Sequence, residues 1–360
     1  MNLQATILRR TLIFYRPART SRGVYHQRLA RYVWLRDADD PAKSGLGECS
    51  PLPDLSCDFS PDYDRLLGEH LRQLTQTGQL DRDRLRPYPS MLMGLETAWR
   101  QWQRSGQPGG GWPLWDSPFS RGEQGLAVNG LIWMGGPDFM RDQIEAKLAQ
   151  GFSCLKLKIG ALNFEEELAI LARLRRRFPD NDLTLRVDAN GAFTPGEALE
   201  KLGRLADLRI HSIEQPLRAG QAAEMAALIE KTPLPIALDE ELIGIHDLAA
   251  KKKLLENLRP QFLVLKPTLH GGFSGAEEWL TLAGSLGIDW WATSALESNL
   301  GLNAIAQWCA TLADEKPQGL GTGGLYANNL TLPLALREER LWLDPAGSWP
   351  DGSSLAADIS

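Results

Sequence analysis

This chain of 360 residues lacks several features, and each absence excludes a class of protein. No apolar run approaches the roughly 18 residues of a membrane-spanning helix, so we expect no membrane partner. The Arg-rich start contains only one apolar stretch, at 12–15, which is far shorter than the core of a signal peptide. The four cysteines are scattered without paired C-x-x-C spacing. That pattern disfavours a thiolate zinc site and predicts reduced thiols in a cytoplasmic protein.

The composition also limits the partners and the fold. The net charge of −6 disfavours a nucleic-acid surface, so we expect none. Apolar residues make up 43% of the chain, which supports a large core. The length suits a barrel of about 250 residues with a smaller additional domain. The sequence carries no signal for the oligomeric state.

The first zone, 1–115, mixes strand-like and helix-like segments. We expect a strand at 31–35 and a helix at 91–102. A stretch rich in Pro and Gly at 108–113 is typical of a linker. The pattern therefore predicts an N-terminal α+β domain.

The second zone, 116–322, repeats a short apolar run followed by a helical pattern. This alternation predicts a parallel sheet, and eight such units close into a (β/α)-barrel. An open, doubly wound sheet is the alternative, because periodicity alone does not distinguish it from a barrel. The expected strands lie at 126–131, 154–159, 183–187, 210–213, 234–238, 262–265 and 288–292, with a weaker eighth near Gly319, and the expected helices at 140–150, 165–178, 195–205 and 275–286.

Polar residues close five successive strands of this zone. In barrels the active site lies at the carboxyl ends of the strands, so these side chains are expected to meet at one rim. The strand-closing residues are Lys156 with Lys158, Asp188, Glu214, Asp239 and Lys266.

Three carboxylates that converge without cations would repel one another. A hard divalent ion resolves this, because Mg²⁺ prefers oxygen ligands; Mn²⁺ is the alternative. We therefore predict a metal held by Asp188, Glu214 and Asp239. Glu240 and Glu241 compete for the third position, and Asp239 is favoured because it directly follows the apolar strand. A lysine beside such a metal has a lowered pKa, which is how an amine becomes a base.

Each of these residues also has a simpler explanation. A lone Lys after a strand is usually solvated, and a lone Asp before Ala-Asn-Gly usually lies in a turn. Their joint occurrence on consecutive strands favours a site. Lys156 and Lys158 are two residues apart and share one face of a strand, as do Arg186, Asp188 and Asn190.

The constellation resembles the enolase superfamily, and within it the muconate-lactonising subgroup. Leu155-Lys156-Leu157-Lys158 is similar to the K-x-K motif of that subgroup. Val187-Asp188-Ala189-Asn190, Ile213-Glu214-Gln215-Pro216 and Leu238-Asp239-Glu240 resemble its three metal-ligand segments. The resemblance implies that Lys158 is the catalytic base and that Lys266 is a second catalytic lysine on the opposite face of the substrate.

The resemblance also extends to the ends of the chain. The segment 45–53 is similar to part of the family's capping domain. The resemblance implies that 1–115 and the tail, 323–360, together cap the barrel, and a strand is expected in the tail at 341–343. Residues 19–23 are expected to form a lid loop, although their arginines also suit a solvated surface.

Further motifs resemble the family of o-succinylbenzoate synthases. These motifs are Arg186, Lys266-Pro267-Thr268-Leu269 and Thr293-Ser294-Ala295-Leu296-Glu297-Ser298. Near Gly319, the Asp-x-Asp of dipeptide epimerases is absent. The resemblance implies a small carboxylate substrate, contacted by Lys156, Arg186, Asn190, Thr293, Ser294 and Gly319.

The implied reaction is a metal-dependent syn-dehydration through an enediolate. Three alternatives in the subgroup stay open: racemisation of N-acylamino acids, epimerisation of dipeptides and cycloisomerisation. Only racemisation needs proton transfer on both faces of the substrate. A barrel that binds metal without catalysis is the alternative from another class.

Overall fold

Seven parallel strands form the central sheet of this computed structural model, which describes residues 2–20, 23–106, 111–312 and 315–359. Their spatial order, β11-β10-β9-β8-β7-β6-β5, follows the chain without a crossover. The strands are β5 (Gly130–Ile132), β6 (Cys154–Lys158), β7 (Thr184–Asp188), β8 (Ser212–Glu214), β9 (Ile236–Leu238), β10 (Phe262–Leu265) and β11 (Asp289–Ala292).

Residues 318 and 319 close this sheet into a ring. Gln318 forms a parallel bridge with Val128, and Gly319 forms one with Thr293 beyond the end of β11. The predicted barrel is therefore confirmed, with the eighth position at the expected place near Gly319, and the open sheet is not what the chain forms.

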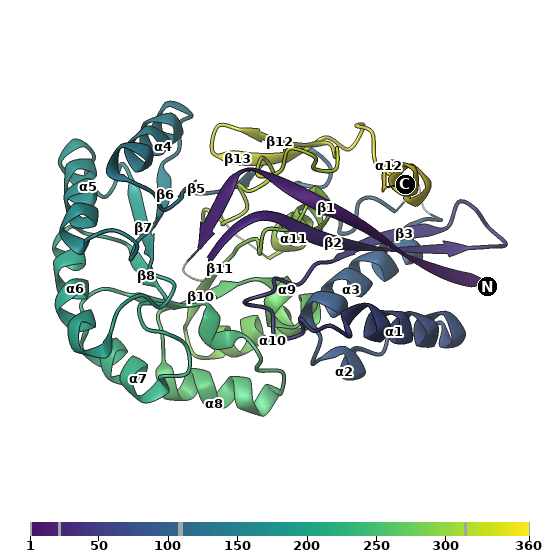
Figure 1. Cartoon of the computed structure of the whole chain (residues 1–360), viewed down its shortest axis with the longest axis horizontal. Helices are drawn as coiled ribbons and strands as arrows, with labels where there is room; N and C mark the ends of the chain where they lie inside the picture. The colour runs from purple at the N-terminus through teal and green to yellow at the C-terminus, as the bar shows by residue number, and fades with distance from the viewer. Residues whose placement is uncertain (1, 21–22, 107–110, 313–314, 360) are drawn as a thin grey trace.

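Helices cover the outside of the sheet, and α4 to α8 form an arc around it (Figure 1). Buried apolar side chains such as Leu155 and Leu157 alternate on β6 with Lys156 and Lys158, which point into the ring. The helices are α4 (Pro137–Ala149), α5 (Phe164–Arg177), α6 (Pro195–Asp207), α7 (Ala222–Lys231), α8 (Leu248–Leu258), α9 (Pro267–His270), α10 (Gly272–Ser285) and α11 (Asn299–Cys309), with a 3₁₀ turn at Glu240–Leu242.

The prediction of one continuous strand at 126–131 is wrong. The segment is divided into β4 (Leu126–Ala127) and β5, because the main-chain nitrogen of Val128 donates to Glu339 and that of Asn129 donates to Gln318. β4 pairs with β13 (Arg340–Leu343), which pairs in turn with β12 (Leu334–Arg337). This second, antiparallel sheet holds the tail against the barrel.

The N-terminal sheet contains two long strands, β1 (Leu3–Thr20) and β2 (Gly23–Asp37), followed by β3 (Ser44–Cys49). The sequence indicated only residues 31–35 of β2 and missed β1. Arg9 and Arg31 stand opposite each other on these strands, and Asp64 binds both guanidinium groups. The like charges would otherwise destabilise the pair.

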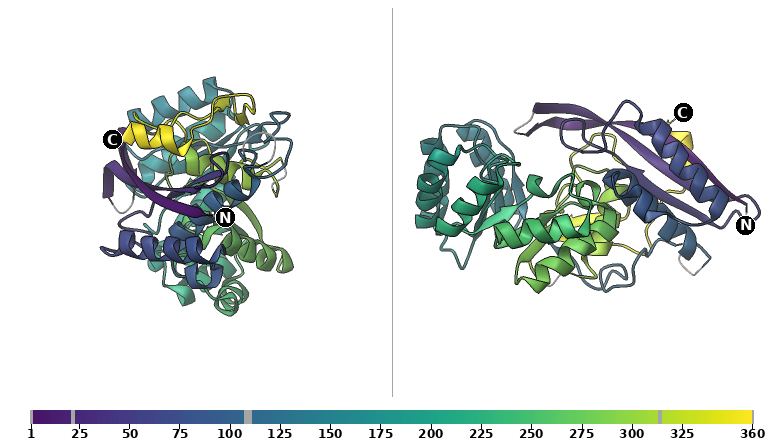
Figure 2. Two further views of the ribbon diagram at one scale, coloured as in Figure 1. Left: turned by 90° about the vertical axis from the view of Figure 1, so that its right-hand side faces the viewer. Right: turned by 90° about the horizontal axis from the view of Figure 1, so that it is seen from below.

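Three helices complete the N-terminal layer: α1 (Tyr63–Thr77), α2 (Arg82–Leu85) and α3 (Pro89–Arg104). Figure 2 shows the β1–β2 hairpin reaching along one side of the molecule toward the barrel helices. Ser21 and Arg22 of the expected lid lie outside the described residues, as do 108–110 of the expected linker.

Two buried charged residues of the N-terminal sheet bind the loop that follows β11. Glu48 accepts hydrogen bonds from the main-chain nitrogens of Ser298 and Gly301, both at 3.0 Å, at the start of α11. Arg28 donates to the carbonyl oxygen of Ala295 at 2.6 Å. The carboxylate is favourable at a helix N-terminus. In the tail, Tyr326 bridges Phe14, and α12 (Gly352–Ile359) packs beside β1 and β3.

The described helices do not include one that combines the length and the apolar character needed to cross a membrane. The described residues contain no disulfide between the four cysteines (Cys49, Cys57, Cys154 and Cys309).

Gly47 of β3 allows the sheet to approach α3 closely. A Cβ atom at this position would lie 1.8 Å from the carbonyl oxygen of Gly94. We therefore expect Gly47→Ala to lower the free energy of unfolding by about 1–3 kcal/mol, the usual cost of overpacking, in urea denaturation. Gly68→Ala is the matched control, because its Cβ meets nothing within 4 Å on α1, and it should stabilise the protein by up to about 1 kcal/mol. Equal stability of the two variants would contradict this account of the contact.

Candidate active site

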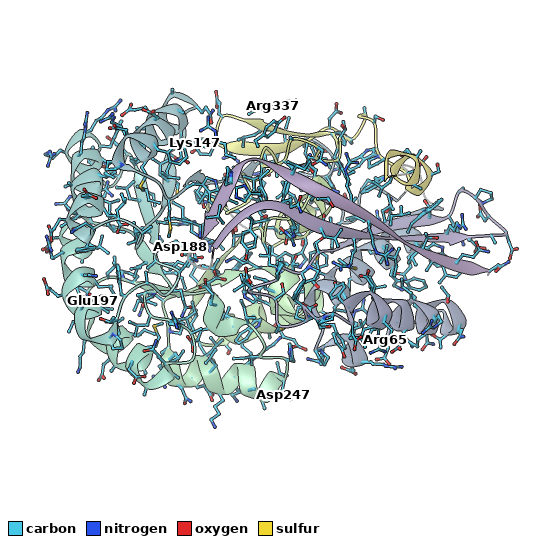
Figure 3. All side chains as sticks on the ribbon, in the orientation of Figure 1. Arg65, Lys147, Asp188, Glu197, Asp247 and Arg337 are labelled. Atoms are coloured by element: carbon cyan, nitrogen blue, oxygen red, sulfur yellow. The ribbon has the colours of Figure 1, made fainter. Side chains whose placement is uncertain are left out.

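The strand register places the charged side chains at one end of the barrel. Lys158 is paired in register with Asp188, and Asp188 with Glu214. Asp239 and Lys266 each follow directly after their strands, β9 and β10. Figure 3 shows Asp188 in the interior of the molecule, whereas the other labelled charged residues lie toward its outside.

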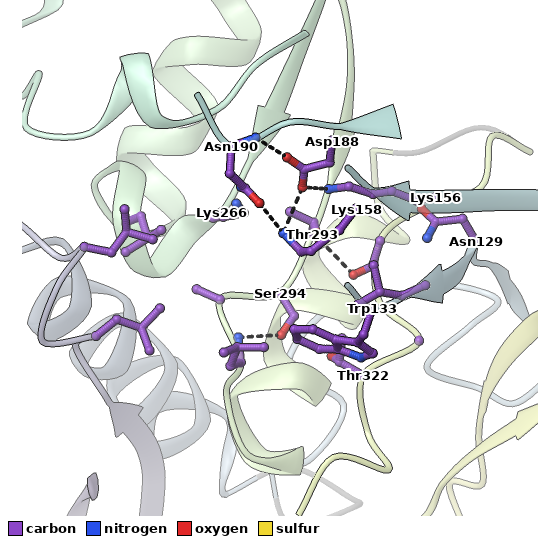
Figure 4. A pocket seen from close by; sticks show the side chains of 18 of the residues that line it. Asn129, Trp133, Lys156, Lys158, Asp188, Asn190, Lys266, Thr293, Ser294 and Thr322 are labelled. Atoms are coloured by element: carbon purple, nitrogen blue, oxygen red, sulfur yellow. Dashed lines mark hydrogen bonds and ion pairs between the residues drawn. The ribbon is translucent and has the colours of Figure 1, made fainter. Parts of the chain in front are cut away.

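Lysine ammonium groups lie between the carboxylates. The Lys156 Nζ atom lies 2.5 Å from Glu214 Oε2 and 3.0 Å from Asp188 Oδ2. Lys158 Nζ also lies 3.0 Å from Asp188 Oδ2 (Figure 4). Lys266 forms an ion pair with Asp239, and its Nζ lies 3.9 Å from Glu214 Oε1.

Burial makes this cluster strongly interacting. The three carboxylate residues are at most 1% exposed. Burial alone would raise the pKa of Asp188, but the charges of Lys156 and Lys158 lower it. Burial and the charge of Asp188 instead raise the pKa of Glu214. Neighbouring carboxyl groups therefore have pKa values shifted in opposite directions, which is typical of functional sites.

Asn190 and Gln215 organise the loops around the cluster. Both have positive φ angles, of 43° and 40°, and asparagine tolerates this conformation better than most residues. Asn190 Oδ1 accepts a hydrogen bond from Lys158 Nζ at 2.8 Å, and its Nδ2 donates to Glu240 Oε1 at 3.0 Å. Gln215 Nε2 donates to Glu241 Oε2 at 3.1 Å. Glu241 is thereby bound to a neighbouring loop, whereas Glu240 lines the pocket.

The donor set fits a hard divalent cation. In the ranges that the structure describes, no three or more His, Cys, Asp and Glu side chains form a ready metal-binding group, because lysines bridge the carboxylates. Three buried carboxylate oxygens of the cluster, Glu214 Oε1, Asp239 Oδ1 and Glu240 Oε2, nevertheless have no hydrogen-bond partner there. Such oxygens are costly unless a cation binds them, and carboxylates are the ligands that Mg²⁺ prefers.

The pocket opens beside the two lysines of β6 (Figure 4). Thr293, Ser294 and Gly319 line it, together with Lys156 and Asn190; their contact with a substrate stays a prediction. Glu297 fixes part of this wall, because its carboxylate accepts hydrogen bonds from Ser294 Oγ and the Ala295 main-chain nitrogen, both at 2.8 Å.

Arg186 does not line this pocket. It lies two residues before Asp188 on β7 and one layer deeper in the barrel. Its guanidinium carbon lies 4.2 Å from the centre of the Trp291 ring, and its Nη1 donates to the Pro317 carbonyl oxygen at 2.8 Å.

Several lining residues were missed by the sequence analysis. An apolar wall lines the same pocket as the lysines, together with Asn129 and Thr322, whose Oδ1 and Oγ1 atoms have no hydrogen-bond partner among the described residues. Asn129 lies within the predicted strand 126–131 and could have been found from that position, whereas the N-terminal residues carry no local signal. The missed residues are Tyr25, Leu52, Leu55, Asn129, Leu131, Trp133, Leu269, Leu296 and Thr322, whereas Glu240, which also lines the pocket, was already the predicted rival for the third metal position.

His270 is a further buried group close to the cluster. Burial lowers the pKa of its imidazole to about 3. The ring is therefore neutral at physiological pH.

Comparisons with known proteins agree with this geometry. Residues 139–344 match the family described as enolase C-terminal domain-like. The chain is 44% identical to an o-succinylbenzoate synthase from Desulfotalea psychrophila, over 93% of this chain and 97% of that protein. It is also 28% identical to an L-Ala-D/L-Glu epimerase from Bacillus subtilis, over 52% of this chain and 50% of that one.

A solved structure gives the same relationship. The crystal structure of MenC from Desulfotalea psychrophila superimposes with a TM-score of 0.81 at 41% identity, covering 95% of this chain and all of that one. Members of the matched family use a divalent metal, typically Mg²⁺. The family match, the similarity over nearly the whole length and the ring of lysines and carboxylates together show that this chain belongs to the enolase superfamily.

Proposed function

We propose that this protein is an o-succinylbenzoate synthase. It would dehydrate 2-succinyl-6-hydroxy-2,4-cyclohexadiene-1-carboxylate to o-succinylbenzoate, a step of menaquinone and phylloquinone biosynthesis. The single observation that carries the proposal is Lys158 beside the Asp188–Glu214–Asp239 cluster, in a chain 44% identical to an enzyme of that name. Four cysteines without a disulfide among the described residues support the cytoplasmic location expected for such an enzyme.

Asp188, Glu214 and Asp239 would hold the divalent metal, which we propose to be Mg²⁺. When bound, the ion supplies the positive charge that stabilises a developing carboxylate dianion. Glu240 is the rival for the third position, because one of its buried oxygens has no partner among the described residues.

Lys158 Nζ would remove the proton from the carbon next to the substrate carboxylate. The electron pair of that C–H bond moves onto the carboxylate, giving an enediolate. The electrons then return to form the ring double bond while the C–O bond to the hydroxyl group breaks. The hydroxide leaves with the proton from Lys158 as water, and the ring becomes aromatic.

Lys266 comes from the opposite wall of the barrel, since β7, β8 and β9 separate its strand from β6. It would stay protonated and stabilise the enediolate from the other face. Lys156, Asn190, Thr293, Ser294 and Gly319 would contact the substrate, and Asn129 with Thr322 would receive its polar groups on the far wall. Arg186 would act from the layer beneath.

The N-terminal residues 1–115 and the tail 323–360 would form a cap on the barrel formed by 116–322. Support comes from Tyr25, Leu52 and Leu55, which line the pocket although they precede the barrel in sequence. Such a cap excludes water from the reaction.

The first test is the Lys158→Ala variant. Turnover of the cyclohexadiene precursor is measured as formation of the aromatic product in the presence of Mg²⁺. We expect this rate to fall by about 10²–10⁴-fold or more, because the base is lost. Lys252→Ala on α8 is the matched control, since that side chain is 61% exposed and far from the cluster. Near-normal turnover in Lys158→Ala would contradict the assignment.

The second test separates the two candidate metal ligands. Asp239→Asn should abolish metal-dependent activity and weaken Mn²⁺ binding by at least about tenfold, whereas Glu240→Gln should retain both to a greater extent. Titration with Mn²⁺ and electron paramagnetic resonance measures the binding. Full activity in Asp239→Asn would transfer the ligand role to Glu240.

A second candidate function is racemisation or epimerisation of an acylated amino acid, which the epimerase relative and the two opposed lysines favour. Incubation of N-acylamino acids in D₂O would then exchange the α-hydrogen of both enantiomers. Exchange of the α-hydrogen, without dehydration of the cyclohexadiene acid, would contradict the synthase proposal and favour a racemase or epimerase.

A further inference from the structure

His270 lies next to the cluster, but no motif pointed to it and the reaction above does not use it. It ends α9, four residues after Lys266, and is 2% exposed. Its Nδ1 atom lies 3.0 Å from the main-chain nitrogen of Lys266. The imidazole is therefore bound to the main chain of the proposed second lysine.

This contact determines which ring nitrogen carries the hydrogen. A main-chain N–H can only donate, so the Nδ1 atom of His270 must accept and carries no hydrogen. The neutral ring then has its hydrogen on Nε2. If both ring nitrogens were protonated, the Nδ1–H group would lie opposite the main-chain N–H of Lys266, and two donors cannot form a hydrogen bond.

The Nε2 side of the ring faces Asp239. The distance from Nε2 to Asp239 Oδ1 is 3.9 Å, and the main-chain carbonyl of Asp239 is close enough to interact as well. Among the residues that the structure describes, neither Nε2 of His270 nor Oδ1 of Asp239 has a hydrogen-bond partner. A buried donor without an acceptor therefore lies opposite a buried acceptor without a donor, and each unsatisfied group costs about 1–3 kcal/mol.

We propose that His270 is a positioning residue for the metal site: its Nε2–H becomes the donor to Asp239 Oδ1 when the 3.9 Å gap between them closes, while Nδ1 accepts from the Lys266 main-chain nitrogen. One neutral imidazole thereby sets the orientation of the third metal-ligating carboxylate relative to the second lysine. The inference rests on the proposed function, because it assigns Asp239 to the metal. Partners of this kind orient the ligating groups in metal sites.

Two substitutions separate the two contacts of the ring. In His270→Asn, the side-chain oxygen can replace Nδ1 as the acceptor for Lys266, but no donor reaches Asp239. In His270→Gln, the amide nitrogen can reach the position of Nε2 and donate to Asp239, but the acceptor for the Lys266 main chain is lost. His246→Asn is the matched control, because this half-buried histidine lies beside Arg86 and Lys251 outside the pocket.

The measurement is Mn²⁺ affinity of the full-length, metal-stripped protein, with circular dichroism and thermal unfolding as checks on folding. We expect His270→Asn to raise the Kd for Mn²⁺ by about 10–100-fold, and His270→Gln and His246→Asn to stay within about threefold of the native protein. Native affinity in folded His270→Asn, or equal weakening in the Asn and Gln variants, would overturn the proposal. Absence of Mn²⁺ binding by the native protein would instead overturn the proposed metal site.

The tautomer can be read without relying on any variant to fold. With ¹⁵N-labelled histidine and saturating Mg²⁺, the native protein should show His270 with hydrogen on Nε2 and an unprotonated Nδ1 that accepts a hydrogen bond. The His270→Gln spectrum, which lacks one set of signals, supplies the assignment. A hydrogen on Nδ1, or on both nitrogens, would overturn the proposal.

Discussion

Repulsion among buried carboxylates is the constraint on which the rest of the site depends. Asp188, Glu214 and Asp239 lie at the same end of adjacent strands, almost without access to water. Such a group is stable only when cations lie among its members. In this structure Lys156 and Lys266 bridge the carboxylates. A divalent ion would share that role, and Lys158 would stand at its edge as the base.

The barrel and the N-terminal sheet each contribute to this arrangement. The barrel positions the charged residues through strand register, because residues that are paired in register on adjacent strands lie side by side. The N-terminal sheet contributes the apolar wall and binds the loop after β11 through Arg28 and Glu48. Because Ser294 belongs to that loop, the shape of the pocket depends on contacts between segments more than 200 residues apart, such as Glu48 with Ser298 at a separation of 250.

The sequence predicted the barrel and the charged cluster because both follow from local periodicity. Lys156 and Lys158 had to share a face, and Asp188, Glu214, Asp239 and Lys266 had to share an end. It could not predict the wall formed by Tyr25, Leu52 and Leu55, since these residues meet the barrel only through tertiary packing.

Local signals failed for other reasons elsewhere. The arginines along β1 obscured a strand on which Asp64 of α1 compensates the charge of Arg9. The break between β4 and β5 depends on pairing with Gln318, nearly 190 residues away in sequence. Arg186 was placed correctly on the inner face of its strand, but its depth in the barrel depends on Trp291, which no local pattern reveals.

The most direct test of this account is a crystal structure with Mg²⁺ and o-succinylbenzoate bound. The account predicts one ion coordinated by Asp188, Glu214, Asp239 and the carboxylate on the ring of the product, with Lys158 and Lys266 on opposite faces of that ring. An ion bound elsewhere, or a product whose reacting carbon lies away from Lys158, would contradict it.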